Sequence, residues 1–109
     1  MPYDKKLEER LNKLVAGRRD FYAQKMFGGV GFLLRGNMCF GIFKNDLILR
    51  VGEEAANKAL KTKGTKPFDI TGRAMKGWVM VVPAAMKTES ALKQWIGLAT
   101  DFVAQLPRK

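Results

Sequence analysis

Two-residue polar turns separate apolar runs in the middle of the sequence, and their spacing constrains the fold more than any other feature. Turns this short can join only neighbouring antiparallel strands. The turns are expected at Gly36-Asn37 and at Asn45-Asp46. The runs that they separate are expected as strands at 30–35, 38–44 and 47–51. A further strand is expected at 21–26, so the sequence predicts an antiparallel meander.

Helices are expected on either side of this meander. Apolar residues recur with helical spacing between Asp4, a candidate N-cap, and Gly17, a candidate stop signal. A second helix is expected over 53–63, because acids open it and lysines close it, in agreement with the helix dipole. A third helix is expected from Leu92 to Pro107, which terminates it. Short strands are expected at 68–70 and 78–82.

Together these elements predict a single α+β domain over residues 1–109. The expected order is one helix, three or four strands, a helix, two strands and a helix. Strands joined by tight turns, with helices collected on one side, form a two-layer architecture. We therefore expect a mainly antiparallel sheet with its helices on one face.

Three closely spaced glycines, Gly28, Gly29 and Gly31, precede the first run of the meander. A phosphate-binding loop needs such glycines between a strand and the start of a helix, where backbone N–H groups and the helix dipole meet the phosphate. Here the following residues, 30–34, are expected as strand, and no Gly-Lys-Ser/Thr sequence follows. The glycines are therefore predicted to form a structural turn or bulge in the sheet, with no cofactor bound.

The sequence contains few of the side chains that catalysis and metal binding use. It has no histidine and one cysteine, Cys39, which excludes a histidine-based triad and a thiolate metal site. Cys39 lies among apolar residues and is expected to be an inert strand cysteine. Glu53 and Glu54 are adjacent, so they diverge on a helix, and its N-terminal dipole explains them. We expect neither an enzyme, nor a metal site, nor a cofactor.

The sequence also bears on the location of the protein. No apolar stretch reaches the roughly 20 residues of a membrane-spanning helix. Residues 1–6 are not followed by the apolar core of a signal peptide, and a lone cysteine cannot form an internal disulfide. A cytoplasmic protein without a membrane partner is therefore expected.

Charge is the most unusual bulk property, since 20 Lys and Arg residues stand against 10 Asp and Glu, a formal net charge of +10. A field of this sign attracts polyanions such as nucleic acid. One segment has Asp69 as its single acid, and Phe68 and Trp78 are close enough in sequence to be candidates for stacking on bases. Its basic residues are Lys58, Lys61, Lys63, Lys66, Arg73 and Lys76. Alternatively, these cations are solvated and the aromatic rings belong to the core.

Two of the expected strands are apolar at consecutive positions, so they carry apolar side chains on both faces. The helices of a two-layer domain cover one face only. The other face is expected to expose Leu33, Ile48, Phe43 and Cys39, or else the opposite set. Exposed apolar patches of this kind mark interfaces. We therefore predict a homodimer, or docking onto another protein, through this face.

Several short motifs occur in a fixed order along the chain. They are Met26-Phe27-Gly28-Gly29-Val30-Gly31, Gly36-Asn37-Met38-Cys39-Phe40-Gly41-Ile42, Asp46-Leu47-Ile48-Leu49-Arg50-Val51, Pro67-Phe68, Val82-Pro83 and Leu92-Lys93-Gln94-Trp95. In this order, across about residues 20–105, they resemble the TfoX N-terminal domain family. The resemblance implies a small α+β domain and a link to regulators of natural competence. Those regulators carry a second, C-terminal helical domain, which we expect this chain to lack.

The leading functional prediction is a non-enzymatic cytoplasmic interaction domain, regulatory in the way that the resemblance implies. The resemblance supplies no catalytic residues. The alternative is direct nucleic-acid binding through the basic segment 58–76.

Overall fold

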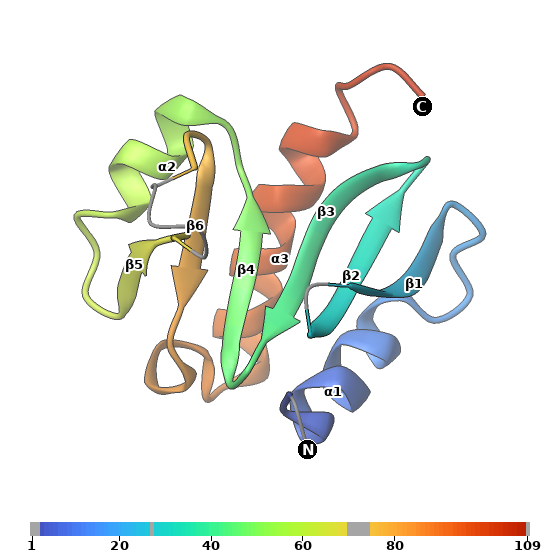
Figure 1. The fold of residues 1–109 in the computed structure, drawn as a ribbon, viewed down its shortest axis with the longest axis horizontal. Coiled ribbons are helices and arrows are strands. Elements are labelled where there is room, and N and C mark those ends of the chain that lie inside the picture. The colour runs from blue at the N-terminus through green and yellow to red at the C-terminus, as the bar shows by residue number, and fades with distance from the viewer. Residues whose placement is uncertain (1–2, 27, 70–74, 109) are drawn as a thin grey trace.

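The structure of the chain, a computed structural model, describes residues 3–26, 28–69 and 75–108. Within this part lie three α-helices and one six-stranded sheet, and Figure 1 shows the sheet in front of the long C-terminal helix. The helices are α1 (Lys5–Val15), α2 (Glu53–Ala59) and α3 (Glu89–Val103), with a 3-10 helix η1 (Pro83–Met86) before α3. The strands are β1 (Phe21–Met26), β2 (Gly29–Leu34), β3 (Asn37–Phe43), β4 (Asp46–Arg50), β5 (Thr65–Pro67) and β6 (Trp78–Val81). The predicted α+β class is confirmed.

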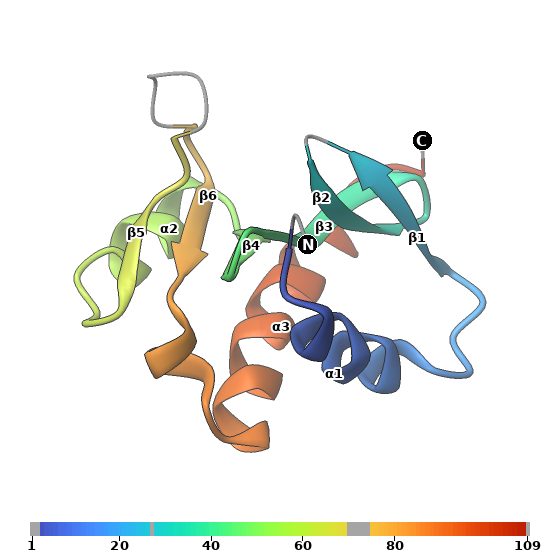
Figure 2. The same cartoon turned by 60° about the horizontal axis from the view of Figure 1, so that its bottom comes forward.

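All neighbouring strands of the sheet are antiparallel, in the order β1-β2-β3-β4-β6-β5. The first four strands follow chain order and form the predicted meander, and β5 lies outside β6, so the two edges are β1 and β5. Figure 2 shows α1 and α3 on the same side of the sheet. Ala56 and Ala59 of α2 belong to the core that these helices share with the sheet. The helices therefore cover one face, as expected.

The main core fills the space between the sheet and the helices. Phe32 and Phe40 lie side by side on neighbouring strands, with stacked rings whose centroids are 5.0 Å apart. Leu11 of α1 and Leu92 of α3 are both 0% exposed in the same core. Burial of each such side chain contributes about 1.5–3 kcal/mol, so this layer supplies most of the stability of the domain.

Both long helices begin at a capping side chain. The carboxylate of Asp4 accepts hydrogen bonds from the backbone N–H groups of Lys6 and Leu7, at 3.0 and 3.2 Å. The hydroxyl of Thr88 accepts one from the N–H of Ala91 at 3.0 Å. These acceptors satisfy N–H groups that have no partner inside the helix. The predicted cap at Asp4 is confirmed.

The two hairpin turns of the meander lie one residue earlier than predicted. They are Arg35-Gly36 and Lys44-Asn45, because Asn37 and Asp46 already belong to strands. Arg35 and Lys44 take left-handed backbone conformations, with φ of 53° and 58°. Such conformations are uncommon for residues other than glycine, so the sequence favoured the Gly-Asn and Asn-Asp pairs.

The segment after α2 also differs from the prediction. The helix ends at Ala59 rather than at residue 63, and the Thr65 hydroxyl donates to the carbonyls of Ala59 at 2.6 Å and of Thr62 at 2.8 Å. Thr65 then starts β5, three residues before the strand predicted at 68–70. Residue 70 lies outside the described residues. The Thr65 side chain thus hydrogen-bonds carbonyl groups at the early C-terminal end of α2.

A β-bulge between β2 and β3 decides which face Cys39 joins. Phe32 pairs with Phe40, but the next residue, Leu33, pairs with Met38. Cys39 is thus the extra residue, and it lies in the main core together with Phe40. The prediction that Cys39 shares a face with Leu33 was wrong, because simple alternation along a strand does not anticipate an inserted residue.

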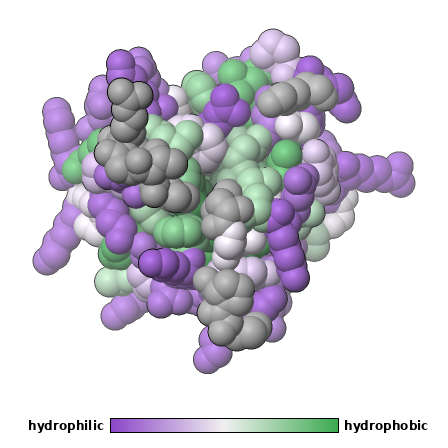
Figure 3. Space-filling model, viewed as in Figure 1, coloured by the Kyte–Doolittle hydropathy of each residue, from purple (hydrophilic) through white to green (hydrophobic). Residues whose placement is uncertain are grey.

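The sheet face that points away from the helices, here called the open face, is apolar but partly covered by the chain itself. Ile48 is 0% exposed there, in a second cluster with Phe68 and Met80. Partly buried Phe43 and Trp78 pack against this cluster. The prediction that Ile48 is exposed was therefore wrong, because Phe68, just beyond β5, packs on it. Figure 3 views this face, with hydrophobic atoms in the middle and hydrophilic atoms around them.

The other half of the open face, over β1 to β3, is shaped by two glycines. Gly31 and Gly41 are partners across β2 and β3. A Cβ placed on Gly31 would lie 2.7 Å from the Met38 sulfur and 2.9 Å from the Met26 sulfur. Both thioethers therefore lie over the bare backbone, and Leu33 beside them is half-buried. This half keeps an apolar surface that is partly open to water.

Candidate functional site

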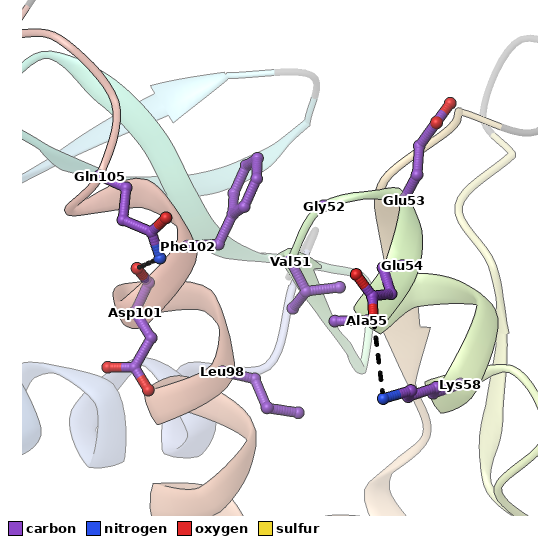
Figure 4. Close-up of a pocket in the computed structure, with 10 residues that line it drawn as sticks. All are labelled: Val51, Gly52, Glu53, Glu54, Ala55, Lys58, Leu98, Asp101, Phe102 and Gln105. Carbon is purple, nitrogen blue, oxygen red and sulfur yellow. Dashed lines mark hydrogen bonds and ion pairs between the residues drawn. The ribbon is translucent and has the colours of Figure 1, made fainter.

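Two adjoining hollows, of about 460 and 590 Å³, form one groove between α2 and α3. Both hollows are lined by Ala55, Lys58, Leu98 and Asp101. Figure 4 shows one of them, with Leu98 reaching from α3 toward Ala55 of α2. We call this site the α2–α3 groove. It lies on the helical side of the domain, away from the open face.

The floor of the groove combines an exposed leucine with bare backbone. Leu98 is 42% exposed. Gly97 lies inside α3, and a Cβ added there would meet no atom within 4 Å. A glycine in a helix interior costs roughly 0.5–1 kcal/mol relative to alanine. No packing contact within the described chain requires glycine at this position, and the backbone of α3 is open to the groove there.

The rim of the groove is acidic, although the chain as a whole is strongly basic. Glu53 and Glu54 line it from α2, and Asp101 lines it from α3. Glu54 pairs with Lys58 across 3.9 Å, but their side chains are 90% and 78% exposed, so this pair contributes little. Within the described part of the chain, Glu53 and Asp101 take part in no ion pair. The groove therefore presents uncompensated negative charge.

The walls of the groove are held by contacts on either side. Gly52, at the N-cap of α2, has φ of 87°, and a Cβ on it would lie 2.7 Å from the ring of Phe102. The ring thus packs directly on the backbone where α2 begins. Farther along, the Trp95 indole N–H donates to the carbonyl of Ala85 at 3.1 Å. These contacts hold α3 against α2 and η1 and set the shape of the groove.

The predicted basic residues do not form one surface. Lys58 lies at the α2–α3 groove, on the helical side. Lys66 lies on β5, in register with Met80 of the open face, and pairs with the Asp46 carboxylate at 2.9 Å. These two lysines thus belong to opposite faces of the sheet, and each has an acidic partner.

The remaining basic candidates are exposed. Lys61 and Lys63 lie in the turn between α2 and β5, and Lys76 lies just before β6. Arg73 lies outside the described residues. Only Lys61 and Lys63 are neighbours in the same turn, so they are the part of the predicted patch that stays together.

The aromatic residues near that segment belong to the second cluster. The rings of Phe68 and Trp78 are tilted by 49°, with centroids 5.6 Å apart. Phe68 is 5% exposed, and the Arg50 guanidinium lies 5.7 Å from the centre of the Trp78 ring. Phe68 therefore offers little area for a stacked base, and its role in the core is the observed one.

The three glycines of the opening motif have different places. Gly28, with φ of 77°, lies in the turn between β1 and β2. Gly29 and Gly31 lie inside β2, so the prediction that all three form a turn was wrong for these two. The turn is shorter than the motif because β1 extends to Met26. A strand follows the glycines, and the helix N-terminus that a phosphate loop would need is not there.

Catalytic chemistry finds little support among the described residues. Burial raises the pKa of the Cys39 thiol to about 12, although a hydrogen bond with Thr100 acts in the other direction. Within residues 3–26, 28–69 and 75–108, no three His, Cys, Asp or Glu side chains gather closely enough to hold a metal ion. In the same ranges no helix has both the length and the apolar character to cross a membrane.

Sequence reasoning missed the groove. Its signal is present in the last helix, where Leu98 falls out of phase with the buried positions Leu92, Ile96, Ala99 and Val103. Gly97 stands beside Leu98 in a segment that otherwise favours helix. An exposed leucine next to a helix-interior glycine is thus the pattern that could have pointed to this surface.

The fold and the groove define a small two-layer α+β domain with an open surface between two of its helices. The sequence model of the TfoX N-terminal domain matches residues 13–103, so the chain belongs to this family. The match runs from the end of α1 to the last residue of α3. No curated protein and no solved structure gave a significant match.

Proposed function

We propose that this chain is a non-enzymatic regulatory domain that binds another protein, and that it receives a basic, amphipathic segment of this protein in the α2–α3 groove. The observation that carries the proposal is the uncovered Gly97 beside the exposed Leu98. A regulatory role related to natural competence is what the resemblance to the TfoX N-terminal domain suggests. The domain is proposed to act in the cytoplasm.

The shape of the groove supports an extended apolar occupant. Gly97 has no side chain, so a helix or strand can approach the backbone of α3 closely there. Ala55 and Ala59 on the facing helix are also small. Small residues let two backbones come close, and an exposed leucine provides apolar area to bury. An occupant with a row of apolar side chains fits this floor.

The charge of the rim supports a basic occupant. Glu53, Glu54 and Asp101 surround the apolar floor, and the excess of positive charge lies elsewhere on the chain. Opposite charges steer encounter and select partners, whereas like charges across an interface repel. Lysine or arginine side chains flanking an apolar row would pair with these carboxylates. The same rim disfavours nucleic acid at this site.

The absence of catalysis is proposed from the chemistry of the chain. It has no histidine, and its single thiol is buried with a raised pKa. General acid–base catalysis near neutral pH relies on groups whose pKa lies close to the working pH. The described residues that line the groove include neither histidine nor cysteine, two common general bases and nucleophiles.

A change of Gly97 to alanine tests the groove directly. We expect G97A to raise the free energy of unfolding by roughly 0.5–1 kcal/mol, because alanine favours the helix and its Cβ meets open space. We also expect it to weaken partner capture, because the methyl group fills the place of the occupant. Thermal unfolding and quantitative capture from native, nuclease-treated lysate measure the two effects.

A matched pair of leucine changes completes this test. Leu98→Gln should abolish capture of the same partner, whereas Leu60→Gln should leave it intact. Leu60 is 36% exposed and lies outside the groove, so it controls for the loss of a surface leucine. Capture that is equal for wild type, G97A and Leu98→Gln would rule out the groove as the binding site.

The nucleic-acid alternative yields a separate prediction. If the +10 charge serves this purpose, affinity for duplex DNA should fall by about 10³-fold or more between 50 and 200 mM salt. Lys61→Glu combined with Lys63→Glu should then weaken binding strongly, because these are the two neighbouring cations of the patch. Fluorescence anisotropy with a labelled duplex measures both effects. If the double variant binds duplex DNA with unchanged affinity, this turn is not the contact surface.

A further inference from the structure

The two edges of the sheet differ in how they are protected. The β5 edge is three residues long and contains Pro67. The β1 edge is six residues long, regular and free of proline, and its residues 22–25 are exposed. Each edge carries one lysine, Lys66 on β5 and Lys25 on β1, so length and proline make the difference. An unprotected edge strand is a template for pairing with another strand, and proteins usually block such edges with short strands, proline or lysine. β1 therefore stands out as a pairing surface.

The backbone groups that β1 offers can be read from its pairing with β2. Asp20 faces this partner, since its carbonyl accepts from the N–H of Arg35 at 2.9 Å. The pairing of β1 with β2 continues without a register shift. The direction of backbone hydrogen bonding alternates along a strand, so the N–H and C=O groups of Tyr22 and Gln24 also point toward β2. Ala23 and Lys25 consequently direct their N–H and C=O groups outward, to the free edge.

We propose that two copies of this chain pair edge to edge through β1, antiparallel, with the two-fold axis at Gln24. In this register Ala23 of each copy lies opposite Lys25 of the other, and their outward groups exchange backbone hydrogen bonds. The two sheets join into one continuous sheet. An isologous contact of this kind uses the same surface on both subunits and closes at a dimer.

The side chains of β1 suit this register. On the open face, Met26 lies opposite Tyr22 of the other copy. Tyr22 is 50% exposed in the single chain, and the Met26 sulfur lies beside Gly31 together with that of Met38. The tyrosine ring thus extends the apolar surface over β1 to β3, and sulfur–aromatic contacts are favourable. The two Gln24 amides face each other at the axis and can hydrogen-bond.

The charges of the edge are compatible with pairing. Lys25 is the single charged residue among the exposed positions 22–25. The register sets each Lys25 against Ala23 and not against the other lysine. Alignment about Ala23 would place Tyr22 opposite Gln24 instead and lose the contact of tyrosine with methionine. The axis at Gln24 is therefore the favoured alignment.

Sedimentation velocity and light scattering on the full chain test the pairing. At up to several hundred micromolar we expect a species of twice the 12.2 kDa chain mass. Ala23→Pro should raise the dissociation constant by at least about tenfold, because it removes an outward N–H but no bond to β2. Ala23→Val keeps the N–H and should still dimerise. A monomer at every concentration, or a dimer unaffected by Ala23→Pro in a folded protein, would overturn the proposal.

Cross-linking tests the alignment. Gln24→Cys places two thiols opposite each other at the axis, so mild oxidation should give a covalent dimer on a non-reducing gel. Ala23→Cys should cross-link much more slowly, because each Ala23 faces Lys25. The native Cys39 is buried, and the wild-type chain provides the blank. Faster cross-linking at position 23 than at position 24 would overturn the axis at Gln24.

Discussion

Phe40→Ala is expected to lower the free energy of unfolding by about 3–5 kcal/mol, one of the two largest effects predicted for this chain. Phe40 is 0% exposed, and its ring lies 5.0 Å from that of Phe32 and 5.7 Å from that of Phe21. Removing it leaves a cavity under three strands. Because domains of this size are stable by only about 5–15 kcal/mol, the variant should be close to unfolding at room temperature. Urea unfolding followed by circular dichroism measures the loss.

Phe43→Ala is the matched control for this change, since it removes the same atoms from the same strand. Phe43 is only half-buried and packs against the small second cluster. Its replacement should cost less than half as much, because neighbouring side chains and water can fill the space. An equal loss for both variants would contradict the assignment of the main core to the helical side.

Gly41→Ala is expected to be the second strongly destabilising change, at about 2–3 kcal/mol. A Cβ at Gly41 would lie 2.6 Å from the carbonyl oxygen of Val30 and 3.2 Å from the Cα of Gly31. Both are backbone atoms of β2, so relief requires the strands to separate. Thermal and urea unfolding give the size of the effect.

Gly31→Ala serves as the comparison, because the two glycines are partners across the same strands. At Gly31 the nearest atoms belong to the flexible ends of Met38 and Met26, which can move aside. The cost should therefore stay below about 1 kcal/mol. If Gly31→Ala proved the more harmful of the two, methionine packing on the open face would be tighter than these contacts suggest.

Much of the fold follows from local signals that act over short distances. Alternating turns and apolar runs predict the meander, because a two-residue turn can join only strands that pair with each other. The α1 cap at Asp4 is likewise a local hydrogen bond. The family resemblance rests on the same segments, and the match over residues 13–103 confirms it.

The errors arise where the outcome depends on residues far apart in the sequence. Ile48 is buried because Phe68 packs on it, which its own strand does not reveal. Cys39 faces the helices because of one inserted residue between paired strands. The shift of the two turns is the exception with a local cause, because Arg35 and Lys44 take left-handed backbone conformations that favour glycine or asparagine.

The candidate site was harder to predict than the fold. The α2–α3 groove is lined from both helices, and Phe102 of α3 packs on Gly52 at the start of α2, so its shape is a property of the two helices together. Net charge pointed to the basic segment, yet Lys58 and Lys66 lie on opposite sides of the sheet. Charge counted along a chain does not tell on which face each cation lies.

The short β5 strand has a consequence for how far assembly could grow. Pro67 lacks an N–H, and a strand of three residues offers a newcomer few places to attach. If two copies pair at their β1 edges as proposed, only these blunted ends remain on the outside. Joining would then stop with the second molecule, and the protein could be present at high concentration in a cell without polymerising into fibrils.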